Sequence, residues 1–354
     1  MDAITIRRPD DFHVHFRRGE ILKSVVPFTA RQFGRAMAMP NTSPEPILTR
    51  GDALKYWLEI TEIVQKVGLS PEDFCPLVTI QITDETEPNT VREIKEEGMG
   101  GHKVIVAGKV YPLGVTTNSH NGVSDFRALY RVFAAMEEVG LVLSLHGQVP
   151  KAFCLDREKE FLDTLAMLAK DFPALRIVME HISTKESVDA LKDLPKTVGA
   201  TITLHHLLIT LHDVLSFVGE EGSEGLNPHH YCQPIPQKLE DRGALIGAAM
   251  SGNPKFFFGS DSAPHLKERK ESSCGCAGVF SAPVLLPLLV GLFEFHGKLD
   301  RLEPFVSEFG ARFYGLPLNQ ETITLNREEW VVPKEYNGIV PFFAGKTVGL
   351  KVQG

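Results

Sequence analysis

The sequence predicts a (β/α)8 TIM barrel, an α/β fold in which parallel strands alternate with helices. Short apolar segments alternate about eight times with longer amphipathic segments. Several of the short segments are continuous apolar runs, as expected of strands that are buried on both faces. The length of 354 residues and the hydrophobic content of 43% fit one large domain.

The predicted elements follow one another in regular order along the chain. The predicted strands are residues 12–16, 36–39, 77–82, 104–107, 141–145, 177–179, 199–203 and 256–258. The predicted helices are residues 21–33, 52–67, 88–97, 125–139, 159–170, 184–194, 238–251 and 282–295. The last of these helices is so apolar that it could belong to the core or to an interface.

The alternation ends at the C-terminal tail, which has only short strand-like pieces at residues 321–325 and 348–352, with prolines between them. No shift in composition marks a second folding unit. We therefore predict a single domain over residues 1–354, with the barrel at about 11–315 and an extension outside it at 316–354.

Composition limits the possible partners. The net charge of −8 argues against nucleic-acid binding, which needs a basic face. No apolar run approaches the ~18 residues that span a membrane, and the polar first eleven residues do not resemble a secretory signal. Five cysteines suit free thiols in a reducing compartment, so we expect a cytoplasmic protein.

Polar side chains stand at the ends of five predicted strands. In a TIM barrel, the C-terminal strand ends share one mouth, where active sites lie. The residues at these ends are His13 and His15, Lys109, His146, Glu180 and His181, and Ser260 and Asp261. Two histidines two positions apart on one strand project from the same face.

Neutral imidazoles and a carboxylate are ligands that suit zinc and similar divalent metals. A bound metal lowers the pKa of water from about 16 to about 7 and makes a nucleophile at neutral pH. A lone histidine after a strand is usually structural, but agreement between five strand ends favours a metal-dependent hydrolase. Spacing alone does not make Lys109 a ligand, because a lysine at a strand end is normally solvated.

The ordered motifs resemble those of the dihydroorotases, in the shorter bacterial- and fungal-type branch of the amidohydrolase superfamily. The similarity covers about residues 11–316, and the tail more loosely. The motifs are Phe12-His13-Val14-His15-Phe16-Arg17, Met39-Pro40-Asn41, Lys109-Val110-Tyr111-Pro112, Thr116-Thr117-Asn118-Ser119, Leu145-His146-Gly147, Glu180-His181, Gly259-Ser260-Asp261-Ser262-Ala263-Pro264-His265 and Glu271-Ser272-Ser273-Cys274-Gly275-Cys276-Ala277-Gly278.

The resemblance implies a metal-dependent amidohydrolase barrel that converts L-dihydroorotate reversibly to N-carbamoyl-L-aspartate, the third step of pyrimidine synthesis. It implies two zinc ions bridged by a hydroxide and by a carboxylated Lys109 (N6-carboxylysine). One ion would be held by His13, His15 and Asp261, and the other by His146 and His181. Asp261 would also move the proton from the hydroxide to the leaving nitrogen. The family further implies a homodimer.

The resemblance also assigns substrate contacts. Arg17, whose planar guanidinium matches a carboxylate, would bind the substrate carboxylate with Asn41 and His265; a salt bridge at the rim is the alternative for Arg17. Thr116 and Thr117 would lie on a loop that closes over the substrate. Gln233 and Ala277 would contribute backbone contacts.

The chain departs from the family pattern at three places. Gln148 stands where glutamate usually follows His146-Gly147, and Gln233 replaces an apolar residue. The stretch at residues 98–108 is longer than usual and holds a second lysine, Lys103, although its context favours Lys109. Cys274 and Cys276 lack further cysteine partners, so we interpret them as structural loop residues.

Two rival interpretations remain open. Hydantoinase- or dihydropyrimidinase-like enzymes use similar metals, but they have longer chains and place a small β domain before the His-X-His motif. A metal-free scaffold is the alternative from another class, although here every ligand position is filled. A metal assay distinguishes the enzyme from the scaffold.

Overall fold

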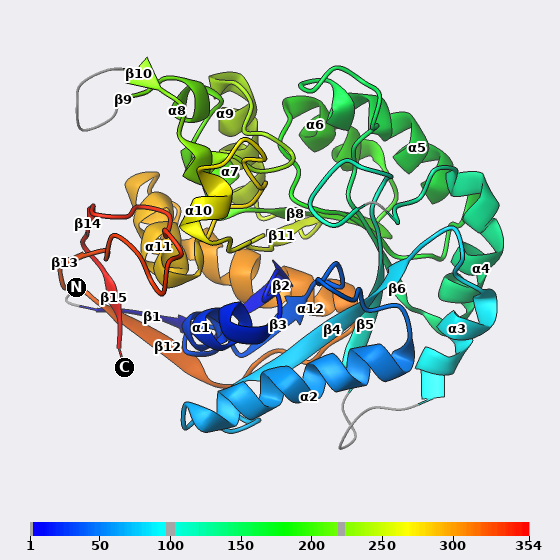
Figure 1. The fold of residues 1–354 in the computed structure, drawn as a ribbon, viewed down its shortest axis with the longest axis horizontal. Coiled ribbons are helices and arrows are strands. Elements are labelled where there is room, and N and C mark those ends of the chain that lie inside the picture. Colours follow the sequence, from blue (N-terminus) through cyan, green and yellow to red (C-terminus); the bar gives the residue numbers. More distant parts are fainter. Residues whose placement is uncertain (1–2, 97–102, 120, 219–223, 354) are drawn as a thin grey trace.

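The protein is seen in a computed structural model, which describes residues 3–96, 103–119, 121–218 and 224–353. It confirms the predicted barrel, with eight parallel strands in the order β11-β8-β7-β6-β5-β4-β3-β2 (Figure 1). These strands are β2 (Asp10–Val14), β3 (Arg35–Ala38), β4 (Cys75–Ile82), β5 (Ile105–Val110), β6 (Val142–Leu145), β7 (Ile177–Met179), β8 (Val198–Ile202) and β11 (Phe256–Phe258). Backbone hydrogen bonds from Asp261 to His13 and from His15 to Ser262 join the last strand end to the first.

Helices surround these strands near the predicted positions (Figure 1). They are α1 (Gly19–Ala30), α2 (Arg50–Lys66), α3 (Pro88–Arg92), α4 (Tyr130–Val139), α5 (Arg157–Asp171), α6 (Lys185–Asp193), α9 (Leu239–Ala249) and α11 (Leu285–Phe295). Local signals fix several ends: Thr49 and Asp52 form a capping box before α2, Thr184 caps α6, and Gly140 ends α4 in the left-handed region. The predicted helix at 88–97 is shorter than expected, and its last residue lies outside the described part.

Short elements between the main units were not predicted, because they are too brief to show a periodic pattern. After β8 the chain forms α7 (Leu204–Leu208), α8 (His212–Leu215), β9 (Phe217–Val218) and β10 (Glu224–Gly225). After β11 it forms α10 (Lys267–Lys270). These segments follow the C-terminal ends of β8 and β11.

The N-terminal strand β1 (Ala3–Arg7) was also missed. It pairs antiparallel with β12 (Thr322–Asn326), which pairs with β15 (Lys351–Val352). Ile4 and Ile6 face inward while their neighbours are more exposed, so this strand buries only one face. A second pair, β13 (Trp330–Val331) and β14 (Thr347–Val348), completes the tail, which pairs with β1 and not with the barrel sheet.

The end of the barrel opposite the mouth is closed by α12 (Phe309–Tyr314). Phe12 from β2 stacks on Tyr314 with ring centroids 4.8 Å apart and meets Phe257 edge-on. A Cβ at Gly310 would lie 2.4 Å from the Phe12 ring, so a glycine lets the helix approach this closely. This plug gives the strands a rigid base on which the polar residues at the opposite ends are held.

Helix α11 packs its inner face into the core, as one of the two interpretations of residues 282–295 expects. Leu285, Leu286, Leu289 and Phe293 are fully buried within the chain, whereas Phe295 at its end is 84% exposed. Within the described ranges, no helix is both long and apolar enough to cross a membrane.

Candidate metal centre and active site

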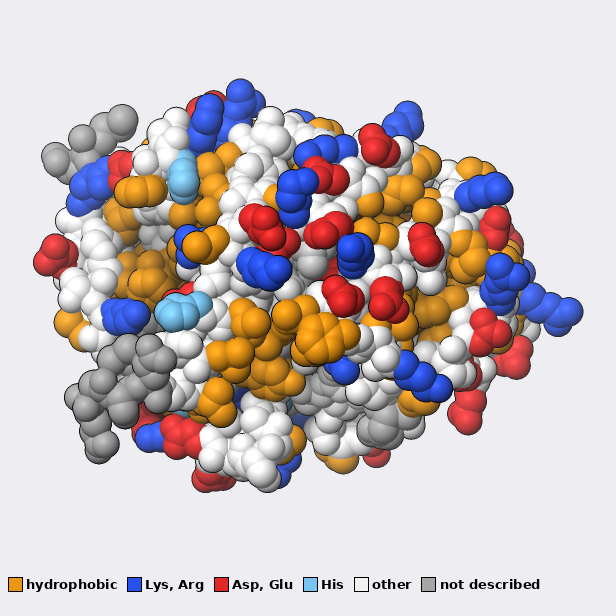
Figure 2. All heavy atoms as spheres, turned by 90° about the horizontal axis from the view of Figure 1, so that it is seen from above, with side chains coloured by type: hydrophobic (Ala, Val, Ile, Leu, Met, Phe, Trp, Pro, Cys, Tyr) orange, Lys and Arg blue, Asp and Glu red, His pale blue; other side chains and the backbone are white. Residues whose placement is uncertain are grey.

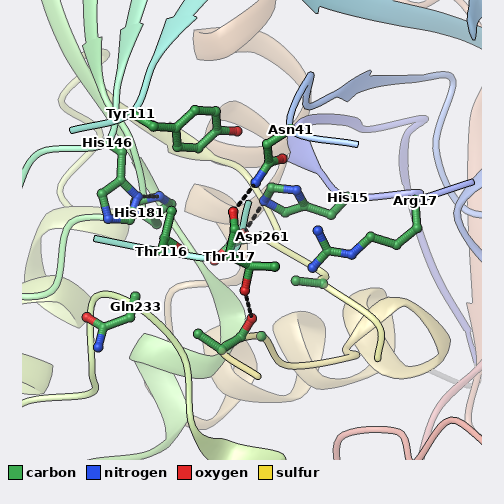
Figure 3. Close-up of a pocket in the computed structure, with 13 residues that line it drawn as sticks. His15, Arg17, Asn41, Tyr111, Thr116, Thr117, His146, His181, Gln233 and Asp261 are labelled. Carbon is green, nitrogen blue, oxygen red and sulfur yellow. Dashed lines mark hydrogen bonds and ion pairs between the residues drawn. The ribbon is translucent and has the colours of Figure 1, made fainter. Parts of the chain in front are cut away.

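The polar residues at the strand ends come together at one mouth of the barrel. His13 lies in β2 and Lys109 in β5, whereas His15, His146, His181 and Asp261 lie just beyond the ends of strands. All six are buried. Figure 3 shows that His15, His146, His181 and Asp261 point toward a common cavity.

His13, His15 and Asp261 form one tight cluster. Their ligand atoms all lie within 4.8 Å of one another. Asp261 Oδ1 is 3.1 Å from His15 Nε2 and 3.5 Å from His13 Nε2. Burial lowers the pKa of His15 to about 4, whereas the contact with His15 and the nearby His13 and His181 hold the pKa of Asp261 well below its usual value despite its burial. At neutral pH the cluster thus presents a neutral His15 imidazole and a carboxylate, which is a metal-binding set.

His146 and His181 form the second part of the site. His146 Nδ1 lies 3.2 Å from His181 Nε2, and burial lowers the pKa of both rings. His146 Nε2 donates to Gln148 Oε1 at 2.8 Å, so Nδ1, which faces His181 Nε2, is the unprotonated nitrogen of the neutral ring. The structure therefore places Gln148, the first departure from the family pattern, directly behind a candidate ligand.

Lys109 lies on β5 and is buried inside the barrel. The strand register places it beside Gln81 of β4 and Ser144 of β6. It is fully buried, its Nζ has no hydrogen-bond partner among the described residues, and burial lowers its pKa to about 8. Lys103, the alternative lysine, is exposed before β5 begins, and residues 98–102 lie outside the described part.

Buried acidic residues that were not assigned a role hold the histidines in place. Glu180 Oε2 lies 2.9 Å from His13 Nδ1 and accepts from Thr201 at 2.6 Å. Asp11 accepts from the His13 backbone and from both the backbone and the hydroxyl of Ser260, and thus ties β2 to the end of β11. Their adjacency to the histidine and Ser-Asp motifs was the available signal, but their partners are distant in sequence.

Three site residues have backbone conformations that non-glycine residues seldom adopt. Arg17, His181 and Asp261 have φ values of 62°, 42° and 43°. Such conformations cost about 1–3 kcal/mol each and cluster at functional sites. Here they turn the chain sharply at strand ends, where the side chains enter the pocket.

The pocket above the metal-type residues is lined by most of the predicted substrate contacts (Figure 3). It is lined by His15, Arg17, Asn41, Tyr111, Thr116, Thr117, His146, His181, Gln233, Asp261, Ala263, Ala277 and Gly278. Arg17 Nη2 contacts His265 Nε2 at 3.0 Å, and Arg17 Nη1 is buried without a partner among the described residues. His265 is therefore beside Arg17, just behind the lining, and not in it.

The segment that carries Thr116 and Thr117 covers this pocket. Thr117 donates to Ala277 O at 3.3 Å, and its own carbonyl accepts from Asn41 Nδ2 at 3.0 Å. Asn118 donates to Asn41 O at 3.0 Å. These contacts fasten the segment across the mouth, which is the closed arrangement of a loop over a binding site.

Gln233 lines the pocket, whereas Cys274 and Cys276 do not. The Gln233 side chain donates to Tyr231 Oη at 3.0 Å, and its Oε1 is buried without a partner among the described residues. Cys274 and Cys276 have sulfurs 3.7 Å apart, and all five cysteines of the chain are free.

The residues present fit a metal centre. Three buried nitrogens, His13 Nε2, Lys109 Nζ and His181 Nδ1, have no hydrogen-bond partner among the described residues. An unpaired buried polar atom costs about 1–3 kcal/mol. Cations placed among neutral imidazoles and the Asp261 carboxylate would remove this cost, so the orphaned atoms support a metal at this position.

Comparisons with known proteins show which family the chain resembles. No family model matches the chain. The dihydroorotase of Vibrio vulnificus is 46% identical over the full length of both chains, and that of Teredinibacter turnerae is 42% identical over 99% of both. The crystal structure of Campylobacter jejuni dihydroorotase has a TM-score of 0.87 at 38% identity and covers 100% of this chain and 98% of its own.

Other solved structures extend the comparison. The Saccharomyces cerevisiae dihydroorotase in complex with 5-fluoroorotic acid has a TM-score of 0.88 at 33% identity and covers 100% of this chain and 99% of its own. The L-hydantoinase of Arthrobacter aurescens shares only the fold, at 16% identity and a TM-score of 0.75 over 99% of this chain and 84% of its own. The chain therefore belongs to the dihydroorotase family, hydrolases that act on a cyclic amide bond.

Proposed function

We propose that this site hydrolyses L-dihydroorotate reversibly to N-carbamoyl-L-aspartate, in pyrimidine synthesis. The observation that carries the proposal is the position of Arg17. This residue lines the same pocket as His15 and Asp261, and its buried Nη1 has no hydrogen-bond partner among the described residues. A guanidinium beside a metal-type cluster matches a substrate that has a carboxylate next to the amide to be cleaved. The bound 5-fluoroorotic acid of the yeast relative is a ligand of this same chemical type.

We further propose two divalent metal ions, zinc or similar, in the cluster. His13, His15 and Asp261 would hold one, His146 and His181 the other, and Lys109 would bridge them. When bound, such ions supply a deprotonated water at neutral pH and polarise the amide carbonyl.

Lys109 can serve as the bridge only after its charge is changed. Its neutral amine would add to carbon dioxide, form an N–C bond and release a proton, and so become a carbamate anion. Burial lowers its pKa to about 8, which makes the neutral amine accessible near neutral pH. A carbamate offers two oxygens, one for each cation.

Asp261 is placed to move the proton. It is an ionised carboxylate at the pocket wall, beside His15. In the hydrolytic direction Asp261 would accept the proton of the attacking water and return it to the leaving ring nitrogen. In ring closure the same carboxylate would move the proton in reverse.

The remaining pocket residues would bind and enclose the substrate. Arg17, Asn41 and His265 would bind its carboxylate, and the backbones of Gln233 and Ala277 would contact its ring. Burial and the neighbouring Arg17 lower the pKa of His265 to about 2, so it is a neutral partner. Thr116 and Thr117 would exclude water from above, which strengthens the charge interactions inside.

A substrate panel tests this assignment. The purified enzyme should hydrolyse dihydroorotate far faster than hydantoin or dihydrouracil in a spectrophotometric assay, with metal content measured on the same sample. Preference for hydantoin or dihydrouracil would support the hydantoinase-type alternative. A protein without bound metal or turnover would support the scaffold.

We also propose a cytoplasmic homodimer with a single-domain subunit. The five free cysteines fit a reducing compartment. Acidic and basic side chains are interspersed over the face shown in Figure 2. The net charge of −8 is the reason that we expect neither nucleic acid nor membrane as a partner. Sedimentation analysis would test the dimer.

A further inference from the structure

A second group of metal-type side chains lies outside the catalytic cluster. His205 and His206 are in α7, just after β8, and Cys232 lies in the wall segment that also carries Gln233. Their ligand atoms are all within 4.8 Å of one another, and all three side chains are buried. The sequence alone does not single them out, because Cys232 is 26 positions beyond His206 in a segment with no regular pattern.

The unpaired ring of His205 is the observation that points to a ligand. It is fully buried, yet neither Nδ1 nor Nε2 has a hydrogen-bond partner among the described residues. Its ring lies 4.6 Å from that of His206, centroid to centroid. A buried imidazole without a partner costs about 1–3 kcal/mol, and a cation bound by the ring would remove that cost.

The other two members converge on one backbone oxygen. His206 Nε2 lies 3.0 Å from Pro234 O, and Cys232 Sγ lies 3.3 Å from the same atom. Thr203 Oγ1, 2.8 Å from His206 Nδ1, orients the ring from behind. Two nitrogens, one sulfur and one nearby carbonyl oxygen form a compact donor set of the kind that binds zinc.

The ionisation of these groups agrees with metal binding at neutral pH. Burial lowers the pKa of His206 to about 4 and that of His205 well below its usual value, so both rings are neutral ligands. Cys232 is a thiol in the absence of a cation and would release its proton when one binds.

From these observations we propose that His205, His206 and Cys232 form a structural site for a zinc-type divalent cation. The site shares no ligand with the catalytic cluster. It joins the end of β8 to residues 231–234, and therefore fixes the segment that presents Gln233 to the substrate pocket.

Cobalt substitution tests the proposal, because only a sulfur ligand gives a sulfur-to-cobalt charge-transfer band in the near ultraviolet. The catalytic residues contain no sulfur, so the band reports this site independently of turnover. We expect wild-type protein loaded with Co²⁺ to show the band and Cys232→Ser to lose it. Cys274→Ser is the matched control, since Cys274 is exposed and belongs to the other thiol pair, and it should keep the band.

A second variant covers a failure of Cys232→Ser to fold, which circular dichroism would reveal. His205→Asn keeps the thiol and should bind one equivalent of zinc fewer than wild type, or bind it at least ~10-fold more weakly, as loss of even an outer-shell partner does. Absence of the band from wild type, its persistence in Cys232→Ser, or unchanged zinc binding in His205→Asn would overturn the proposal and leave a polar pocket that holds water.

Discussion

Glu180 orients His13 through a contact of 2.9 Å between Oε2 and Nδ1, in the closed interior of the barrel. Although burial raises its pKa, the nearby His13 and Lys109 hold the pKa of Glu180 below its usual value, so it is ionised. An ionised carboxylate can only accept, and His13 Nδ1 must therefore carry the proton. His13 Nε2, on the other side of the ring, lies 3.5 Å from Asp261 Oδ1.

This relationship predicts that Glu180→Gln weakens metal binding while the fold is kept. Glutamine has the same length, but its amide can present a donor to His13 Nδ1 and does not fix the tautomer. Loss of such an outer-shell carboxylate usually lowers metal affinity by about 10–100-fold. Zinc affinity measured by chelator competition checks this.

Glu186 offers the matched control for this substitution, since it is a half-exposed glutamate on α6. Glu186→Gln makes the same chemical change away from the histidines and should leave zinc affinity unchanged. Equal affinities in wild type and Glu180→Gln would show that Glu180 only fills space.

Lys109→Ala should abolish turnover and lower the bound metal, because it removes the proposed bridge between the two cations. The exposed Lys103 gives a matched control, and Lys103→Ala should retain activity and metal. Turnover by Lys109→Ala at the wild-type rate would contradict the bridging role. Metal analysis on the same samples separates loss of the cations from loss of chemistry.

The fold was predictable to the extent that it follows from local pattern. Strands such as β4 and β6 are buried on both faces, so their sequences are apolar runs. The helices before them have recognisable capping residues, Thr49 at the start of α2 and Gly140 at the end of α4. The strand β1 was missed because its pairing with β12 joins the two ends of the chain. Helix α12 was missed because it closes the barrel by packing on Phe12, which lies about 300 residues earlier in the chain.

The site was predictable where residue type and strand position agree. His13, His15, His146, His181 and Asp261 all stand at strand ends. The structure brings the last four to one cavity and His13 beside His15 and Asp261. The supporting contacts were not predictable, because Glu180 meets Thr201 and Asp11 meets Ser260 only through the lateral arrangement of strands. Glu180 and Asp11 are next to the ligand motifs in the sequence, but this position does not show which residue each one contacts in the fold.

Asp261→Ala should lose turnover in both directions, because one carboxylate moves the proton in hydrolysis and in ring closure. General acid–base groups contribute typically 10²–10⁴-fold to the rate. Asp261→Asn separates the roles, since it keeps an oxygen near His15 but cannot take the proton. Normal cyclisation of N-carbamoyl-L-aspartate by either variant would rule out the proton-transfer role.

Arg17→Ala should raise the KM for dihydroorotate by roughly 10–100-fold, the effect of losing a hydrogen bond to a charged group worth about 1.5–3 kcal/mol. Stability should change little. Arg18→Ala is the control, because the Arg18 guanidinium pairs with Glu59 at 2.8 Å and does not line the pocket. An unaltered KM in Arg17→Ala would count against Arg17 as the carboxylate partner.

The buried histidines predict a loss of stability of the metal-free protein in mild acid. Burial lowers the pKa of His146 from the usual 6.5 to about 3. Below pH 6.5 the unfolded chain takes up a proton at this position that the folded chain refuses, so the stabilising effect falls as the pH falls toward 3. Between pH 6.5 and pH 5 this amounts to about 2 kcal/mol for one such histidine. Thermal unfolding of the metal-free wild type and of metal-free His146→Gln, each at pH 6.5 and pH 5, checks this. On going to pH 5, the free energy of unfolding of the variant should improve relative to wild type by that amount. A difference that does not change with pH would show that His146 is not buried as a neutral ring.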